Sequence, residues 1–251
     1  MPTIQIERQG RAAYLTIDRP PLNVLDIATL NELCDTLAAL RSDDALRVLV
    51  LTGAGRCFSA GVDVADHTPE RVPAMLDAVT NAIRALFTFP APTVALVHGH
   101  VLGGGLELAL ACDTIVARRG ATLGLPEIKL GVFAPYAAIL LPPLVGRQVA
   151  LDLLYTGRSI DIEEAARIGL VQKILSEEED PSLAELIQAL EAHSASALRL
   201  TKRAVLETLG LRLEEALHTV NRLYCDTLMQ THDAHEGLAA FIEKRPPRWH
   251  M

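Results

Sequence analysis

The sequence predicts an α/β protein with parallel strands and a helical C-terminal portion. Two continuous apolar segments, 47–52 and 93–97, are typical of strands buried on both faces of a parallel sheet. Helical segments separate the predicted strands, and this alternation favours parallel pairing. After about residue 180 only segments with helical spacing follow. A chain of 251 residues buries about 70–75% of its unfolded surface, so its core needs neither disulfides nor metal.

Each predicted element follows from a local pattern of apolar residues. Segment 4–17 alternates between apolar and polar residues and predicts two strands around Gln9-Gly10. Leucines at helical spacing predict a helix over 27–40. Further helices are predicted over 70–87 and 106–111, a third buried strand over 114–117, and C-terminal helices over 182–192, 195–209, 213–230 and 235–244. The acidic run 177–180 predicts a solvated boundary before these C-terminal helices.

The composition excludes several classes of protein. Lys and Arg total 23 and Asp and Glu total 31, which gives a net charge of −8. Nonspecific binding to nucleic acid or anionic membranes relies on Lys and Arg, so we expect neither partner. No apolar stretch reaches the ~18 residues of a membrane span, and the N-terminus does not resemble a signal peptide. We expect a cytoplasmic protein without a metal site, whose cysteines are reduced thiols in or near the core: Cys34, Cys57, Cys112 and Cys225.

Two glycine-rich loops, 53–63 and 98–107, follow the two buried strands. Neither matches the nucleotide-binding patterns GxxxxGK[ST] and GxGxxG, and Ser59 lacks the preceding glycine of a serine-hydrolase elbow. Glycines 103–105 lead directly into a helix, whose first N–H groups are unpaired and lie at the positive end of its dipole. One turn from each loop could therefore supply an N–H donor to an oxygen that becomes negative during a reaction. On the glycines alone, these could equally be ordinary tight turns.

Five motifs, found in order along nearly the whole chain, resemble the crotonase superfamily of enoyl-CoA hydratases and isomerases. The two loops match GxGxxFSAGxD and GxxxGGGxxLxxxCD. Arg19-Pro20 with Asn23 matches RPxxN, Pro126-Glu127 matches the PE element, and residues 233–245 match DxxEGxxxFxEKR. The resemblance implies the crotonase (ClpP/crotonase-like) fold. That fold would place a repeated ββα spiral core over residues 1–190 and a helical trimerisation portion over residues 191–251.

The resemblance also implies an acyl-CoA thioester as substrate and no separate cofactor, since CoA is part of the substrate. The family's oxyanion hole falls on the backbone N–H groups of Val62 and Gly104. The two carboxyl groups of the family's hydratases fall on Glu107 and Glu127. Two carboxyl groups can hold one water, accept its proton and deliver a proton to the substrate. Taken singly, each acid could instead be a residue at a helix end or in a loop.

The segment after Glu127 departs from the common hydratase pattern. Where most hydratases show GxxPGxGGTQRL, this chain has bulkier residues over 131–143. Together with residues 157–161 and 232–237, this segment resembles cyclohexa-1,5-diene-1-carbonyl-CoA hydratases, which act in anaerobic degradation of aromatic acids through benzoyl-CoA. We therefore expect Phe133 and Tyr136 to line a pocket for a ring. The alternatives are a general short-chain enoyl-CoA hydratase and a noncatalytic subunit that binds CoA esters or acts as a scaffold.

The predicted substrate-binding residues are Asn23, Ala60, Asp63, Phe133, Tyr136, Arg56, Phe241 and Lys244. CoA carries phosphates, so an acidic chain needs a local positive group. Arg56 and Lys244 are the candidates, although each could be part of a solvated surface. The family's trimeric assembly suggests that Phe241 and Lys244 meet the CoA of a neighbouring subunit in a trimer or a dimer of trimers; an amphipathic packing helix is the alternative. We expect His98 and His100 to be core or turn histidines.

Overall fold

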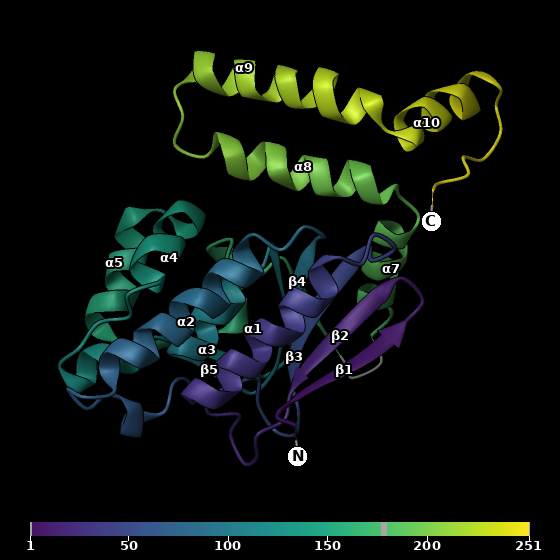
Figure 1. Cartoon of the computed structure of the whole chain (residues 1–251). Helices are drawn as coiled ribbons and strands as arrows, with labels where there is room; N and C mark the ends of the chain where they lie inside the picture. Colours follow the sequence, from purple (N-terminus) through teal and green to yellow (C-terminus); the bar gives the residue numbers. More distant parts are fainter. Residues whose placement is uncertain (1, 177–179, 251) are drawn as a thin grey trace.

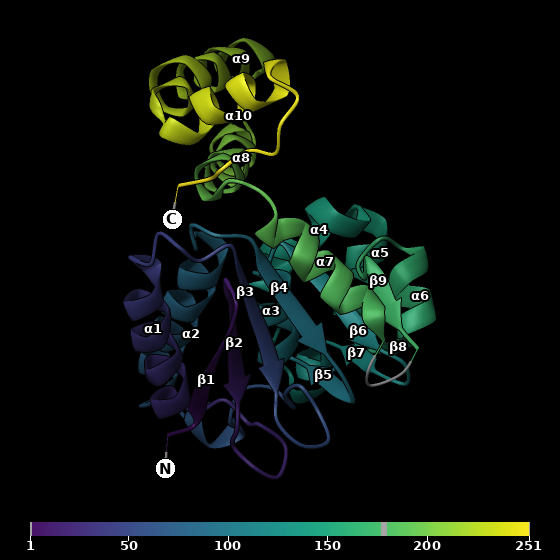
Figure 2. The same cartoon turned by 90° about the vertical axis from the view of Figure 1, so that its right-hand side faces the viewer.

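A six-stranded mixed sheet forms the centre of the molecule (Figures 1 and 2). The computed structural model describes residues 2–176 and 180–250. The strand order is β1-β2-β3-β4-β6-β9; β1 and β2 are antiparallel, and the other neighbours are parallel. The strands are β1 Ile4–Gln9, β2 Ala12–Ile17, β3 Val48–Gly53, β4 Thr93–Val97, β6 Thr114–Arg118 and β9 Lys173–Leu175. The predicted strands in segments 4–17, 47–52, 93–97 and 114–117 are thus confirmed.

Strands β3 and β4 are buried because helices cover both faces of the sheet. Leu49 and Leu51 pack into the large core cluster with α1 and α2, whereas Val48 and Val50 join a smaller cluster with α7. These helices are α1 Ile27–Arg41, α2 Val72–Phe87 and α7 Pro181–Glu191. Because β3 and β4 pair in parallel, their carboxyl ends lie at the same edge of the sheet. Both glycine loops leave the sheet at this edge.

A second, three-stranded sheet lies beside the first and was not predicted. It contains β5 His100–Leu102, β7 Thr122–Gly124 and β8 Ser159–Asp161. Strands of three residues are too short to produce a recognisable apolar alternation. An isolated bridge adds Ser59 to this sheet beside Val101. Each of β3, β4 and β6 is therefore followed by a short extended segment and then by a helix, which is the expected ββα repeat.

The helices that follow these short segments complete the core. The second repeat leads into α3 Gly104–Leu110, and the third leads through the short helix η2 Pro126–Leu130 into α4 Ala137–Val145. All seven residues of α3 are buried. The remaining elements of this part are η1 Val64–Asp66, α5 Arg147–Thr156 and α6 Ile162–Arg167.

Helices α8, α9 and α10 lie beyond one end of the sheet in both views (Figures 1 and 2). They span Ala195–Thr208, Leu213–Arg222 and His232–Ile242. The single helix predicted over 213–230 is wrong beyond Arg222. Residues Leu223–Thr227 form a π-helix, and Leu228–Gln230 form a 3-10 helix after Thr227, whose φ of −121° departs from helical geometry. Helix α10 begins before residue 235 because the Thr231 side chain accepts the Ala234 N–H and caps it.

The predicted boundary near residue 190 falls at the end of α7. Contacts cross it: fully buried Arg47 donates to the carbonyls of His193 and His250, both at 3.2 Å. Of the predicted acidic run, residues 177–179 lie outside the described residues. Asp180 accepts the Ser182 N–H at 2.9 Å and caps α7. The division into a core and a trimerisation portion stays a prediction.

The cysteines are free thiols, and three of the four lie where the sequence predicts. Cys57 is buried, and Cys34 and Cys112 pack against the core. Cys225 is exposed in the irregular segment after α9, which differs from the prediction. Among the described residues, no helix is both long and apolar enough to cross a membrane.

Candidate active site

Hydrogen bonds hold the two glycine loops against each other. The N–H groups of Phe58 and Ser59 donate to the carbonyls of His98 and His100 at 2.8 and 3.2 Å. Gly99 permits this approach, because a Cβ there would lie 2.1 Å from a carbonyl oxygen of the first loop. The His98 Nε2 lies 3.0 Å from the Gly55 carbonyl oxygen in the first loop, and the His100 Nδ1 lies 3.1 Å from the Thr122 Oγ1 on β7, so both imidazoles have structural hydrogen-bond partners. The two loops form one unit at the carboxyl edge of the sheet.

Two backbone N–H groups, those of Val62 and Gly104, lie close together in this unit. Leu25 donates to the Gly61 carbonyl at 2.9 Å and accepts the Asp63 N–H at 3.0 Å, so the Val62 N–H points away from Leu25. Gly104 opens α3, where an N–H has no acceptor within the helix. A Cβ on Gly104 would lie 3.5 Å from the Val62 nitrogen. Across residues 2–176 and 180–250 neither group donates a hydrogen bond, so both are available to one acceptor.

Glu107 is a buried carboxyl group on α3. It is 3% exposed, and its Oε1 accepts the N–H groups of Tyr136 and Ala137 at 2.9 and 3.0 Å. Ala137 is the first residue of α4, so this oxygen also lies at the positive end of that helix. Burial, together with the nearby charge of Glu127, raises the pKa of Glu107 to about 7, although the N–H groups of Ala137 and Tyr136 oppose this rise. Near neutral pH this carboxyl can therefore hold or release a proton.

Glu127 lies in η2, against the glycine turn of the second loop. A Cβ on Gly103 would lie 2.7 Å from its Oε1, and Gly103 has a φ of +52°. Its Oε2 is buried, with no hydrogen-bond partner among the described residues. Burial raises the pKa of Glu127, and His67 partly offsets this effect. Buried polar groups are normally paired, so an orphan carboxylate oxygen is typical of a functional site.

Both acids and both N–H donors line one cavity of about 350 Å³. Its other lining residues come mainly from α2 and the segment 131–136: His67, Val72, Met75, Leu76, Val79, Gly131, Val132, Phe133, Pro135 and Tyr136. Apolar walls with a few converging polar groups are typical of small-molecule sites. The cavity therefore suits an apolar group held beside an acid–base pair.

His67 is a titratable lining residue that the sequence analysis missed. It follows the first-loop motif by four residues, and no motif position pointed to it. Its Nδ1 lies 3.1 Å from the Asp63 carbonyl oxygen, which fixes the ring as a donor at that nitrogen. The imidazole favours the charged form of Glu127 and lowers the pKa of that carboxyl.

The structure corrects the predicted role of Asn23. This residue is 2% exposed and does not line the cavity that contains the two acids, so its side chain is not placed to contact substrate. Its Nδ2 donates to the carbonyls of Ala54 and Cys57 at 2.9 and 2.8 Å. Asn23 thus holds the first glycine loop in place from beneath.

Five other predicted substrate-binding residues lie outside the cavity lining: Ala60, Asp63, Arg56, Phe241 and Lys244. The Asp63 carboxylate accepts the Ala65 N–H at 3.0 Å and caps η1. Arg56 is exposed in the first loop, Phe241 is 84% exposed near the end of α10, and Lys244 follows that helix. Substrate contacts of these residues remain predictions.

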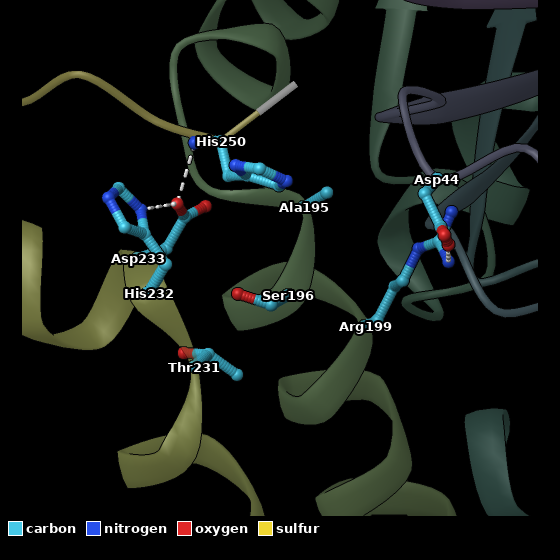
Figure 3. A pocket seen from close by; sticks show the side chains of 8 residues that line it. All are labelled: Asp44, Ala195, Ser196, Arg199, Thr231, His232, Asp233 and His250. Atoms are coloured by element: carbon cyan, nitrogen blue, oxygen red, sulfur yellow. Dashed lines mark hydrogen bonds and ion pairs between the residues drawn. The ribbon is translucent and has the colours of Figure 1, made fainter.

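A second cavity, of about 210 Å³, lies where α8 and α10 meet the loop after α1 (Figure 3). Its lining residues are Asp44, Ala195, Ser196, Arg199, Thr231, His232, Asp233 and His250. Asp233 accepts the His250 N–H at 2.6 Å and lies 3.2 Å from the His232 Nδ1. These bonds hold the C-terminal segment on α10, and the predicted site residues lie elsewhere.

Comparison with known proteins places the chain in a family. Residues 7–251 match the sequence model of the enoyl-CoA hydratase/isomerase family. Cyclohexa-1,5-dienecarbonyl-CoA hydratase of Thauera aromatica is 39% identical over 98% of this chain and 95% of its own length. For 2,3-dehydroadipyl-CoA hydratase of Escherichia coli the identity is 34%, over 98% of each chain. The crystal structure of the Bacillus anthracis enoyl-CoA hydratase superposes with a TM-score of 0.93 at 32% identity, covering 98% of each chain.

The chain therefore belongs to the enoyl-CoA hydratase/isomerase family. The expected crotonase fold is confirmed by the structural neighbours. The expected class of enzyme, an acyl-CoA hydratase and thus a hydro-lyase, is confirmed by the family and its hydratase relatives.

Proposed function

We propose that the substrate is cyclohexa-1,5-diene-1-carbonyl-CoA, and that hydration yields 6-hydroxycyclohex-1-ene-1-carbonyl-CoA. The observation that supports the hydration chemistry is that Glu107 and Glu127 line one cavity with Val62 and Gly104, whose N–H groups donate no hydrogen bond within the described part of the chain. Likeness to the Thauera aromatica enzyme and the apolar wall with Phe133 and Tyr136 support a ring-shaped acyl group. In this proposal the enzyme acts in the cytoplasm, in anaerobic degradation of benzoyl-CoA.

The first part of the proposed mechanism concerns the thioester oxygen. The N–H groups of Val62 and Gly104 both donate to this oxygen. Attack on the β-carbon makes the oxygen negative, and the two donors stabilise it more strongly in the transition state than in the substrate. Loss of one such donor costs about 3–4 kcal/mol in comparable enzymes.

The second part concerns water and two protons. The water oxygen bonds to the ring carbon β to the thioester while one carboxylate, of Glu107 or Glu127, accepts its proton. The electrons of the broken double bond spread over the thioester oxygen and the second ring double bond as a dienolate. The other, protonated carboxyl then delivers its proton to the far end of this dienolate, and a double bond remains next to the thioester. One water is added, and the two acids exchange protonation states.

The proposed partners follow from the substrate. The reaction requires no cofactor, because CoA enters as part of the thioester. We expect Arg56 and Lys244 to meet the CoA phosphates, against the acidic balance of the chain. We expect a homotrimer or a dimer of trimers, in which Phe241 and Lys244 approach the CoA of a neighbouring subunit.

The test is hydration by the purified protein of the cyclic dienoyl-CoA and of crotonyl-CoA. The proposal expects the higher kcat/KM for the dienoyl-CoA. Faster turnover of crotonyl-CoA would favour the second candidate, a general short-chain enoyl-CoA hydratase, which the other hydratase relatives support. A protein that binds acyl-CoA but hydrates neither compound would instead be a noncatalytic or scaffold subunit.

A further inference from the structure

The proposed acyl cavity has two walls that come from different parts of the chain. One wall is the inner face of α2, with Val72, Met75, Leu76 and Val79. The other is the segment 131–136, which departs from the common hydratase pattern. The separation of these walls decides how bulky an acyl group the cavity accepts.

The Tyr136 side chain ties the two walls together. Its hydroxyl donates to the Leu76 carbonyl on α2 at 2.9 Å and lies 2.8 Å from the Thr80 Oγ1 on the same helix. A phenol has one proton, so the Thr80 hydroxyl is the donor in the second bond. Burial raises the pKa of Tyr136, which keeps the phenol protonated. These bonds span one turn of α2 and oppose its movement away from segment 131–136.

The backbone of the same residue is fixed to a proposed catalytic acid. The Tyr136 N–H donates to the Glu107 Oε1 at 2.9 Å. One residue therefore joins α2 through its side chain and Glu107 through its main chain. A bulkier acyl group could separate the walls only by breaking the hydroxyl bonds or by pulling on Glu107.

We infer that the hydrogen bonds of Tyr136 to Thr80 and Leu76 hold the two walls of the acyl cavity at a fixed separation, limit the volume of the cavity and so select compact acyl groups over larger ones. The inference rests on the proposed function, because it assigns the cavity to the acyl group. In this role Tyr136 is a specificity-determining residue, and Thr80 is a positioning residue that acts through it. A six-membered ring needs less volume than a ten-carbon 2-enoyl chain, and the cavity of about 350 Å³ gains volume only if its two walls separate.

The test compares kcat/KM for the cyclic dienoyl-CoA with that for dec-2-enoyl-CoA. Tyr136→Phe and Thr80→Val remove the same hydrogen bond from opposite sides and nearly preserve volume. Thr80→Val is expected to shift the ratio toward the long chain by about 2- to 12-fold, the range of one net hydrogen bond. Tyr136→Phe also loses the bond to the Leu76 carbonyl and is expected to shift the ratio at least as far. The double variant is expected to shift the ratio no further than Tyr136→Phe, because the shared bond is already lost. Tyr155→Phe, at a 69% exposed position on α5, is the matched control and should keep the wild-type ratio.

The outcomes separate this inference from the proposed function. Wild-type protein that hydrates neither thioester overturns the proposed function and the inference with it. If the wild type is active and both single variants keep its ratio, the size selection is wrong while the hydratase assignment stands. An equal loss of kcat on both substrates, with an unchanged ratio of kcat/KM values, also overturns the size selection, because Tyr136 would then act only through Glu107. Near-UV circular dichroism verifies that each variant is folded.

Discussion

At the scale of single residues, the site contains two buried carboxyl groups whose charged forms are disfavoured by burial. Glu107 has two N–H donors on one oxygen, yet burial still raises its pKa to about 7. Glu127 keeps one buried oxygen without a partner in the described chain. Groups of this kind cost stability and persist where chemistry requires them. The raised pKa values allow one acid to be protonated while the other is charged near neutral pH.

The paired acids predict that either one is indispensable. Glu107→Gln and Glu127→Gln should each lower kcat by about 10²- to 10⁴-fold, the usual contribution of a general acid or base. Gln keeps the size and hydrogen bonding of the side chain but cannot transfer the proton. Steady-state hydration kinetics of the two variants measure the loss. Near wild-type rates in both would show that the two-acid mechanism is wrong.

Glu107→Gln should also stabilise the fold above neutral pH. The native state raises the pKa of Glu107 from 4.5 to about 7, so it binds this proton more tightly than the unfolded chain. Stability therefore falls as the pH rises from about 4.5 through about 7. Gln accepts the same two N–H groups without a charge and removes this cost, about 3 kcal/mol at full ionisation. Urea unfolding at about pH 5 and about pH 8 should show a gain that grows with pH; an equal gain at both would contradict the prediction.

At the scale of elements, the long patterns were predictable and the short ones were not. Strands β3 and β4 followed from continuous apolar runs, and their parallel pairing brings the two glycine loops together. Strands β5, β7 and β8 have three residues each and left no periodic signal. The α2 wall and His67 were missed because their place in the cavity depends on packing between distant segments. Asn23 was predicted to bind substrate because a motif position does not show whether a residue contacts the substrate or hydrogen-bonds to the loop that does.

The glycine turn before α3 gives a prediction at this scale. Gly103→Ala places a Cβ 2.7 Å from the Glu127 Oε1 at a φ of +52°, so the carboxyl must move. Gly120→Ala is the matched control, since its φ is +83° but nothing lies within 4 Å of the added Cβ. Both variants should lose about 1–3 kcal/mol of stability from backbone strain at positive φ. Only Gly103→Ala should also lose hydration activity. Equal activity in the two variants would show that the Gly103 turn does not position the Glu127 carboxyl.

At the scale of the whole molecule, the −8 charge and the amphipathic helix α9 have different consequences. The charge disfavours polyanionic polymers, whereas a small anion such as CoA needs only a local positive group. Helix α9 and the π-helix after it carry an exposed apolar stripe, spaced by three or four residues: Leu213, Leu217 and Val220 on α9 and Tyr224 just beyond it. Apolar stripes of this size on soluble proteins are typical of contact surfaces. The sequence showed the helical pattern, but the exposure of the stripe depends on how α9 packs.

This stripe predicts how the oligomer responds to a charge. Wild-type protein is expected at three or six times the 27.1 kDa chain mass by light scattering. Leu217→Glu, in the middle of the stripe and 50% exposed, should reduce the mass toward that of one chain, because a buried unpaired charge disfavours the interface. His218→Glu introduces an acidic side chain at the adjacent position outside the stripe and should keep the wild-type mass.

If Phe241 and Lys244 approach the CoA of a neighbouring subunit, Leu217→Glu should also raise KM for acyl-CoA. An unchanged mass would show that α9 does not form the interface. A lower mass with an unchanged KM would show that Phe241 and Lys244 do not contribute to the site of a neighbouring subunit.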